Sequence, residues 1–421
     1  MTYVRRIIDN LLDEVIPGLP AIALEGAKGV GKTATASQRA ATTIDLDDPL
    51  QLETLRANPD WITQAPPPVF IDEWQLHPPI WDKVRRAVDR DPSGTHVLLA
   101  GSAGVAPGVR THSGAGRIVR MMMRPLSFAE RGLERPTVSL QELMAGAAPT
   151  ISGETRVGLP EYVDEILRSG FPGIRRAAPR HRGLQLDSYV DRIVEHELPE
   201  NGVEVRRPGV LRAWLLAYGA ATATDAAYST ILDAATPGEL DKPPRPTVDS
   251  YREHLTRIFL LDPIPAWTPA FAPLRRLTKK PKHHLVDPAL AARLAGIDER
   301  ALLQGRITRI GAVAGTWLGA LFESLVTQSV RVYATDATVG HLRSADTTRE
   351  IDLIVEDRGL NVVAIEVKLV GSVSDKDVRH LNWLQEQLGE RVVDKVIITT
   401  GPYAYRRPDG VAVVPLALLG P

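Results

Sequence analysis

The sequence predicts an α/β protein of two or three domains, with a mainly parallel sheet near its N-terminus. At 421 residues, the chain is long enough for more than one hydrophobic core. From residue 1 to about 135, short apolar runs alternate with helical stretches, which is typical of a parallel sheet covered on both faces. In this region, residues 26–33 fit the phosphate-binding pattern G-x-x-x-x-G-K-[ST] without a mismatch.

The phosphate-binding loop has the surroundings that its chemistry requires. Residues 21–24 (AIAL) predict a buried strand entering the loop, and the Ala-rich residues 33–41 predict a helix leaving it. Glycines allow successive backbone N–H groups to point at a β-phosphate, Lys32 is expected to bind the β- and γ-phosphates, and Thr33 to reach Mg²⁺. The predicted ATP-binding residues of the loop are Gly26, Ala27, Lys28, Gly29, Val30, Gly31, Lys32 and Thr33.

Two further strands are expected to end beside this loop. Residues 69–73 (VFIDE) predict a central strand that ends in two acids, of which Asp72 would contact Mg²⁺ and Glu73 would polarise the attacking water. An exposed acidic turn is the alternative for this pair. Residues 97–102 (VLLAGS) predict the next strand, whose tip carries Ser102 at the ligand crevice of the sheet. Ser102 would sense the γ-phosphate or the water; a capping serine is the alternative.

An arginine supplied by a neighbouring subunit would neutralise charge in the transition state. Arg117, just before the predicted strand IVRMMM, is the candidate, and Arg120 and Arg124 are its rivals. Each of these arginines is otherwise a plausible surface residue.

The order of phosphate loop, DE-ended strand, LLAGS strand and GAGR…RPLSFAERG resembles bacterial and archaeal ATPases of the AAA type. It is most similar to the branch whose ATPase module precedes a C-terminal domain of unknown function, which combines a winged-helix-like segment with a restriction-endonuclease-like core. The resemblance covers essentially the whole chain and implies a sheet order of 5-1-4-3-2 and assembly into a ring or dimer. Most AAA proteins have an asparagine where Ser102 stands, whereas the narrower branch carries GS.

Three regions follow from the texture of the sequence. Residues 1–135 form the expected ATPase domain, residues 136–300 a helical and winged-helix-like region, and residues 301–421 the restriction-endonuclease-like domain. The last region begins with a long helix and then shows apolar runs typical of strands, at residues 339–344, 349–357, 361–370, 394–401 and 411–418. A helix over residues 378–389 separates the third of these from the fourth.

The middle region carries a basic run. The amphipathic residues 247–261 predict the second helix of a helix-turn-helix. The segment from Arg275 to His284 follows, and residues 274–284 (LRRLTKKPKHH) contain five Lys or Arg and no acid. A basic wing at this position suits DNA phosphates. A solvated, lysine-rich hairpin is the equally weighted alternative.

The C-terminal region carries candidate carboxylates. Glu366 and Lys368 are two apart on a predicted strand and so share a face, with Asp352 on the preceding strand expected beside them. Glu323 interrupts an apolar helix, where an unpaired acid is costly. The order Glu323…Asp352…Glu366-x-Lys368 resembles a restriction-endonuclease-like site, in which the three acids hold a second Mg²⁺ or Mn²⁺ and Lys368 acts near the attacking water. A salt-bridge cluster, and a fold kept only for binding, are the alternatives.

Composition limits the remaining choices. A net charge of −1 gives no overall electrostatic reason for a nucleic-acid partner, and the absence of cysteine excludes disulfides and thiolate chemistry. The amphipathic N-terminus is not a signal peptide, and no run approaches the ~18 uncharged residues of a membrane span. We therefore expect a soluble, cytoplasmic protein without a membrane partner.

These observations predict a Mg²⁺-dependent ATPase. Three classes compete for the rest of its function: an ATP-driven nuclease, a DNA-binding ATPase that does not cleave, and a signalling switch that binds protein partners. The carboxylate pattern favours the two DNA classes over the third.

Overall fold

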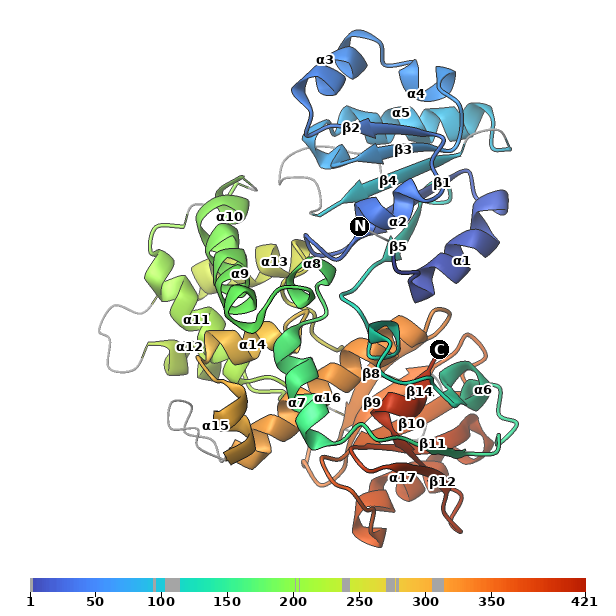
Figure 1. The fold of residues 1–421 in the computed structure, drawn as a ribbon, viewed down its shortest axis with the longest axis vertical. Coiled ribbons are helices and arrows are strands. Elements are labelled where there is room, and N and C mark those ends of the chain that lie inside the picture. The colour runs from blue at the N-terminus through green and yellow to red at the C-terminus, as the bar shows by residue number, and fades with distance from the viewer. Residues whose placement is uncertain are drawn as a thin grey trace.

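The computed structural model describes residues 3–93, 96–102, 114–200, 202–203, 205–236, 243–269, 277, 280–304 and 314–421. In Figure 1 the N-terminal sheet lies at the top, the C-terminal sheet at the bottom, and a group of helices to one side of both. Among the described residues, no helix has the length and apolar character that crossing a bilayer requires.

The N-terminal sheet is fully parallel and has the order β2-β3-β4-β1-β5, which is the predicted 5-1-4-3-2 order. Its strands are β1 (Ala21–Glu25), β2 (Thr42–Asp45), β3 (Val69–Asp72), β4 (Val97–Gly101) and β5 (Val119–Met122). Its helices are α1 (Ile7–Val15), α2 (Lys32–Ser37), α3 (Pro49–Ala57), α4 (Trp61–Gln64) and α5 (Pro79–Arg90). The central strands are buried on both sides, as continuous apolar runs require.

The helical region holds several short helices. They are α7 (Leu159–Arg168), α8 (Pro172–Arg175), α9 (Pro179–Arg192), α10 (Leu198–Glu200), α11 (Pro208–Ala220), α12 (Tyr228–Ala235), α13 (Arg245–Arg257), α14 (Pro288–Leu294) and α15 (Glu299–Gln304). After α13, two antiparallel bridges join Leu261 to Leu285 and Ile264 to Lys282. The predicted winged-helix-like segment thus contains a ribbon after its second helix, but this ribbon packs inside the protein because Lys282 and Leu285 are buried.

The C-terminal sheet is mixed and has the order β7-β12-β13-β11-β10-β9-β8. Its strands are β7 (Ser152–Glu154), β8 (Thr338–Arg343), β9 (Glu350–Glu356), β10 (Val362–Val367), β11 (Val392–Thr399), β12 (Tyr403–Arg406) and β13 (Ala412–Pro415). The long helix α16 (Ala314–Tyr333) shares a core with one face, and α17 (Asp375–Leu388) covers the other. The five apolar runs expected near the C-terminus are all strands, whereas the sequence patterns missed β7 and β12.

The path of the chain adds one feature to the three predicted regions. After β5, the chain reaches the C-terminal sheet before it enters the helical region (Figure 1). There β7 pairs with β12, and β6 (Val138–Ser139), which leads into α6 (Leu140–Met144), pairs with β14 (Leu419–Gly420). Two strands, β6 and β7, therefore pair with C-terminal strands, although the boundaries at 135 and 300 assign them to the middle region.

Candidate functional site

The loop between β1 and α2 is shaped by its glycines. Gly29 and Gly31 have φ values of +82° and +103°, a region that other residues adopt only with strain. At Gly26, a Cβ atom would lie 2.1 Å from the carbonyl oxygen of Met123 on the neighbouring chain segment. A side chain at this position is therefore incompatible with the loop, and the pattern predicted from sequence has its structural reason here.

Lys32 folds back over this loop. Its ammonium donates to the carbonyl oxygens of Gly26 at 2.8 Å and Ala27 at 3.0 Å. Burial lowers the pKa of Lys32 to about 8, although Glu73 and Asp72 nearby oppose the shift. A buried ammonium held by neutral carbonyls is suited to an anionic ligand such as a phosphate.

Asp72 and Glu73 end β3 beside the loop. Burial raises the pKa of Asp72, while a hydrogen bond with Thr33 opposes the rise. Asp72 therefore lies beside the hydroxyl with which it was predicted to hold Mg²⁺. Glu73 has a left-handed backbone with φ of 49°, and its Oε2 accepts hydrogen bonds from Gln75 and, at 3.4 Å, from the hydroxyl of Ser102. The strand tip predicted to carry a sensor thus contacts the predicted base.

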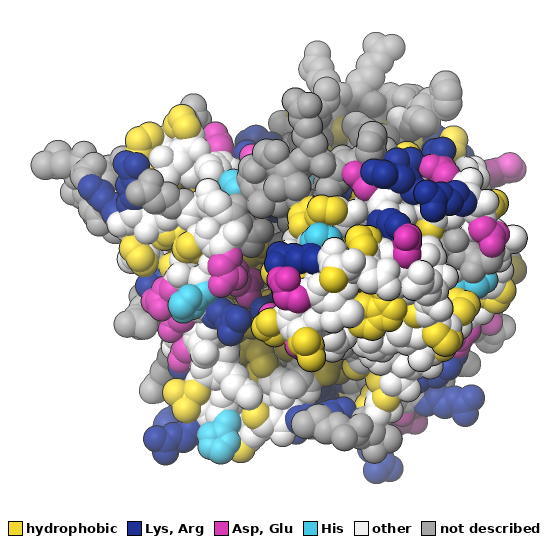
Figure 2. Space-filling model, turned by 90° about the horizontal axis from the view of Figure 1, so that it is seen from above, with side chains coloured by type: hydrophobic (Ala, Val, Ile, Leu, Met, Phe, Trp, Pro, Cys, Tyr) yellow, Lys and Arg dark blue, Asp and Glu magenta, His cyan; other side chains and the backbone are white. Residues whose placement is uncertain are grey.

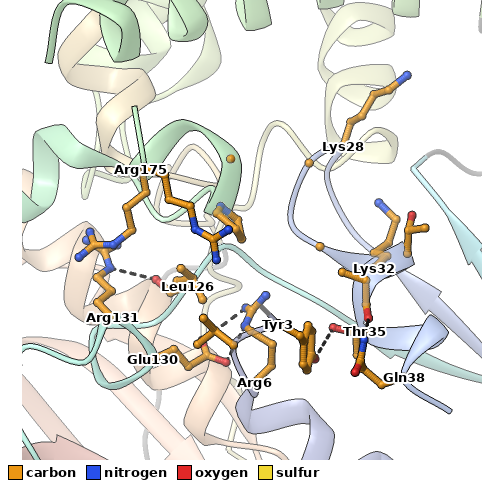
Figure 3. A pocket seen from close by; sticks show the side chains of 18 of the residues that line it. Tyr3, Arg6, Lys28, Lys32, Thr35, Gln38, Leu126, Glu130, Arg131 and Arg175 are labelled. Atoms are coloured by element: carbon orange, nitrogen blue, oxygen red, sulfur yellow. Dashed lines mark hydrogen bonds and ion pairs between the residues drawn. The ribbon is translucent and has the colours of Figure 1, made fainter. Parts of the chain in front are cut away.

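A cavity of about 880 Å³ lies against the loop. Figure 3 shows its two walls: Lys28 and Lys32 lie on one, and Arg131 and Arg175 lie on the other. The segment from the end of α7 to the residue after α8 contributes Arg168, Arg175 and Arg176 to the lining. The loop also contacts the helical region directly, because the Tyr189 hydroxyl on α9 donates to the carbonyl of Lys28 at 3.2 Å.

The arginines of this second wall were not among the predicted site residues. Glu165 anchors them: it pairs with Arg175 at 2.5 Å and with Arg131 at 3.1 Å, and it lies 3.5 Å from Arg168. Burial would raise the pKa of Glu165, but the two closer arginines lower it, so the carboxylate stays charged. The signal available in the sequence was the set of basic residues on either side of the turn from Ser169 to Gly173.

Arg6 also lines the cavity, and the sequence patterns did not reveal it either. Its side chain is buried and donates to the carbonyls of Val30 and Arg124, each at 2.8 Å, and pairs with Glu130 at 2.8 Å. Tyr3, at the edge of the cavity, lies 3.0 Å from the Thr35 hydroxyl. The N-terminal segment is therefore part of the nucleotide pocket and supports the loop from outside.

Arg117 lies away from this cavity. It donates to Asp89 at 2.9 Å, and 48% of its side chain is exposed. It does not line the pocket of its own chain. Of its rivals, Arg124 pairs with Asp262 at 2.8 Å, and Arg120 pairs with Glu25 at 3.4 Å.

The C-terminal carboxylates come together as their spacing predicts. Lys368 pairs with Glu366 at 2.6 Å, and Asp352 accepts the backbone N–H of Val367 at 2.9 Å. Glu323 reaches the same group from α16, and Glu350, which was not predicted, joins it from β9. We call Glu323, Glu350, Asp352 and Glu366 the acid cluster.

The cation inside the acid cluster corrects two predictions. Lys282, expected to face DNA on a basic wing, is 1% exposed. Its ammonium lies 2.7 Å from Glu323, 3.0 Å from Asp352 and 3.2 Å from Glu350. Among the residues that the structure describes, no group of three or more His, Asp or Glu is arranged to hold a metal ion. The second Mg²⁺ or Mn²⁺ expected at Glu323, Asp352 and Glu366 therefore has no support, because a lysine lies among these acids.

The charge states of the acid cluster follow from its burial. Burial, and then Asp352, raises the pKa of both Glu323 and Glu366 to about 8. Burial would also raise the pKa of Asp352, but Lys282 and Lys368 lower it. Burial would lower the pKa of Lys282, but Asp352, Glu323 and Glu350 raise it well above its ordinary value.

The rest of the predicted basic wing is only partly described. His283 and His284 are buried like Lys282, because this part of the segment forms the inner ribbon. Lys280 is exposed. Arg275, Arg276 and Lys279 lie outside the described residues.

Comparison with known proteins divides the chain into three successive matches. Residues 19–132 match an AAA domain family, residues 159–301 a domain of unknown function (DUF8612), and residues 318–419 a second domain of unknown function (DUF4143). An uncharacterized protein of Mycobacterium bovis and one of Mycobacterium tuberculosis are each 25% identical over 314 residues, which is 73% of this chain and 62% of the relative. The match thus spans less than two thirds of these relatives. A Walker-type ATPase of Pyrococcus abyssi superposes with a TM-score of 0.38 at 16% identity, covering 68% of this chain and 94% of that one.

Proposed function

Because residues 19–132 form an AAA-type P-loop ATPase module, followed by a C-terminal domain of unknown function as the sequence predicted, we propose that the chain is a Mg²⁺-dependent ATPase whose nucleotide state controls the helical and C-terminal parts. The single observation that carries the ATPase proposal is Lys32. Its buried ammonium, with a pKa lowered by burial to about 8, lines the cavity. The loop that carries it can adopt its backbone path only because Gly26 has no side chain.

Each residue of the pocket has a role in this proposal. Lys32 and the loop N–H groups bind the phosphates, and Thr33 and Asp72 hold the metal ion. Mg²⁺, when bound, neutralises charge that develops on the transferred phosphoryl group. Glu73 takes the proton of the attacking water, and Ser102 keeps the Glu73 carboxylate oriented through its 3.4 Å hydrogen bond.

The second wall of the cavity, which carries Arg131 and Arg175, supplies further positive charge from the same chain. Glu165 fixes Arg175 and Arg131 and leaves the edge of the cavity basic. Arg117, which is half exposed, is assigned to the pocket of a neighbouring copy. A homo-oligomer is therefore part of the proposal.

Transmission to the rest of the molecule starts at the same wall. Ser169 and Gly170 both donate to Asp287, which caps α14 by accepting the N–H of Ala289 at 2.9 Å. The residues just before Asp287 are also held by α16, because Gln328 donates to the carbonyl of Val286 at 3.0 Å. A phosphate-dependent shift of this wall would therefore act on α14 and, through it, on α16, which packs against β10 of the C-terminal sheet.

The test is ATP binding and phosphate release by the purified full chain in Mg²⁺. Lys32→Ala should abolish both, because the anion-binding ammonium is lost, whereas Lys376→Ala, an exposed lysine on α17, should change neither. A wild-type chain with no affinity for ATP in Mg²⁺ would overturn the proposal.

DNA binding is a second candidate function. Its support is the run of five Lys or Arg without an acid at residues 274–284, of which Lys280 is exposed. Lys279→Glu with Lys280→Glu should weaken binding of a labelled duplex, and raising salt from ~50 to ~200 mM should weaken it further. Lys376→Glu is the control for charge alone. If the duplex does not bind even at ~50 mM salt, the C-terminal parts act on protein partners instead.

A further inference from the structure

Lys282 is surrounded by carboxylates in a way that surface lysines are not. Its ammonium makes three ion pairs within 3.2 Å, to Glu323, Asp352 and Glu350. Its side chain is 2% exposed, so almost no water reaches it. Removing this ammonium would leave the buried carboxylates without the cation they share.

The backbone holds this ammonium in place. The N–H of Lys282 donates to the carbonyl of Ile264 at 2.9 Å, and its own carbonyl accepts the N–H of Ile264 at the same distance. The next residue is fixed too, because the N–H of His283 donates to the carbonyl of Thr224 at 2.8 Å. These backbone hydrogen bonds of the ribbon therefore fix the position of Lys282 beside the acid cluster.

The oxygens of the cluster are largely committed. Asp352 gives Oδ1 to Lys282 and Oδ2 to the N–H of Val367, and Glu366 gives Oε1 to Lys368. Glu366 Oε2 is buried and has no hydrogen-bond partner among the described residues. A divalent ion needs several of these oxygens to converge at about 2.1 Å. The oxygens of Glu323, Asp352 and Glu350 converge instead on the Lys282 nitrogen.

We propose that Lys282 is the resident cation of the acid cluster, and that its ammonium excludes a divalent metal ion. The cluster then fastens the ribbon of the helical region to the C-terminal sheet, and the domain does not cleave phosphodiesters by metal-activated water. Removing the ammonium alone should convert the cluster into a cation site, because four acids would remain with only Lys368 beside them.

The test is Mn²⁺ binding by the nucleotide-free full chain at pH 8, measured from the EPR signal of the Mn²⁺ that remains free. The wild-type chain should bind no Mn²⁺ at the cluster, and Lys282→Met should gain a Mn²⁺ site, which adding Asp352→Asn to the same chain removes. Lys368→Met is the matched control: it removes the other lysine but leaves Lys282 in place, so it should gain nothing.

Two results would overturn the proposal. One is a wild-type site that Asp352→Asn weakens, since the metal would then displace Lys282. The other is a folded Lys282→Met chain that gains no site, since the ammonium would then not be what excludes the ion.

A second measurement needs no variant. Amine labelling of the wild-type chain, read by mass spectrometry, should leave Lys282 unmodified with and without Mn²⁺ while the exposed Lys376 reacts. Labelling of Lys282 that appears on adding Mn²⁺ would contradict the proposal. Because no nucleotide is present, either outcome leaves the ATPase proposal standing.

Discussion

The Asp287 carboxylate accepts a hydrogen bond from the Ser169 hydroxyl at 3.0 Å, and this contact joins the wall of the nucleotide pocket to the start of α14. The same oxygen accepts the N–H of Gly170 at 2.6 Å. Asp287→Asn keeps the shape but removes the charge from three hydrogen bonds of a fully buried group. We expect the free energy of unfolding to fall by about 2 kcal/mol, measured by denaturant unfolding.

The control for Asp287→Asn is Asp298→Asn. Asp298 is exposed and accepts a hydrogen bond from Ala301 at the start of α15, so its loss should cost less than about 1 kcal/mol. The coupling itself is read by hydrogen exchange: ATP should slow exchange in α14 of the wild type and not of Asp287→Asn. Equal slowing in both chains would contradict transmission through this contact.

Replacing Glu73 by Gln tests the proposed base. Glutamine still accepts the hydrogen bonds from Ser102 and Gln75 but cannot take a proton from water. We expect ATP to bind with unchanged affinity and the rate of phosphate release to fall by about 10²–10⁴-fold. Glu53→Gln, on the exposed face of α3, should leave the rate unchanged. Turnover of Glu73→Gln at the parental rate would show that another group is the base.

Local spacing was enough to predict much of both sites. Residues two apart on a strand share a face, so the pairing of Glu366 with Lys368 could be read from the sequence and is seen at 2.6 Å. The glycine pattern likewise encodes its own backbone, because a Cβ at Gly26 would meet a carbonyl oxygen. Local spacing could not predict the strand order of the N-terminal sheet, which was predicted from the resemblance to AAA-type ATPases.

Long-range pairing is what the sequence did not show. Lys282 stands among basic residues in the chain, and that neighbourhood suggested an exposed wing. Its partners Glu323 and Asp352 lie 41 and 70 residues away and meet it only in the folded protein. Arg6 was missed for the same reason, since Glu130 is 124 residues from it. The sequence around a charged residue does not show which distant acid it will pair with when the folded protein buries it.

The pKa of Lys32 predicts how ATP affinity depends on pH. In the free chain burial lowers this pKa to about 8, whereas a bound triphosphate favours the charged ammonium and raises it. Binding therefore takes up a proton at pH values above 8. At pH 9 about a tenth of the free chain carries the ammonium, so the affinity should be roughly tenfold weaker than at pH 7.

The measurement for Lys32 is calorimetric titration of ATP with Mg²⁺ at pH 9 in two buffers that differ in ionisation enthalpy. Proton uptake makes the observed heats differ between the buffers. Lys32→Arg keeps a cation that does not titrate in this range, so it should show no such difference. Buffer-independent heats for the wild type at pH 9 would contradict a lysine that loses its proton near pH 8.

The last prediction concerns Arg117, whose half-exposed side chain pairs with the surface acid Asp89 at 2.9 Å. If it acts on a neighbouring copy, Arg117→Ala and Glu73→Gln should each hydrolyse ATP slowly but partly restore each other on mixing. In the mixture, a pocket with intact Glu73 meets a neighbour with intact Arg117, and an arginine of this kind contributes about 10³–10⁵-fold to the rate. Phosphate release well above the sum of the separate variants is the expected result. Arg120→Ala is the matched control: its side chain pairs with Glu25 of its own chain, so this variant alone should hydrolyse ATP at the parental rate. A mixture that only averages the two slow rates would show that Arg117 has no role in a neighbouring pocket.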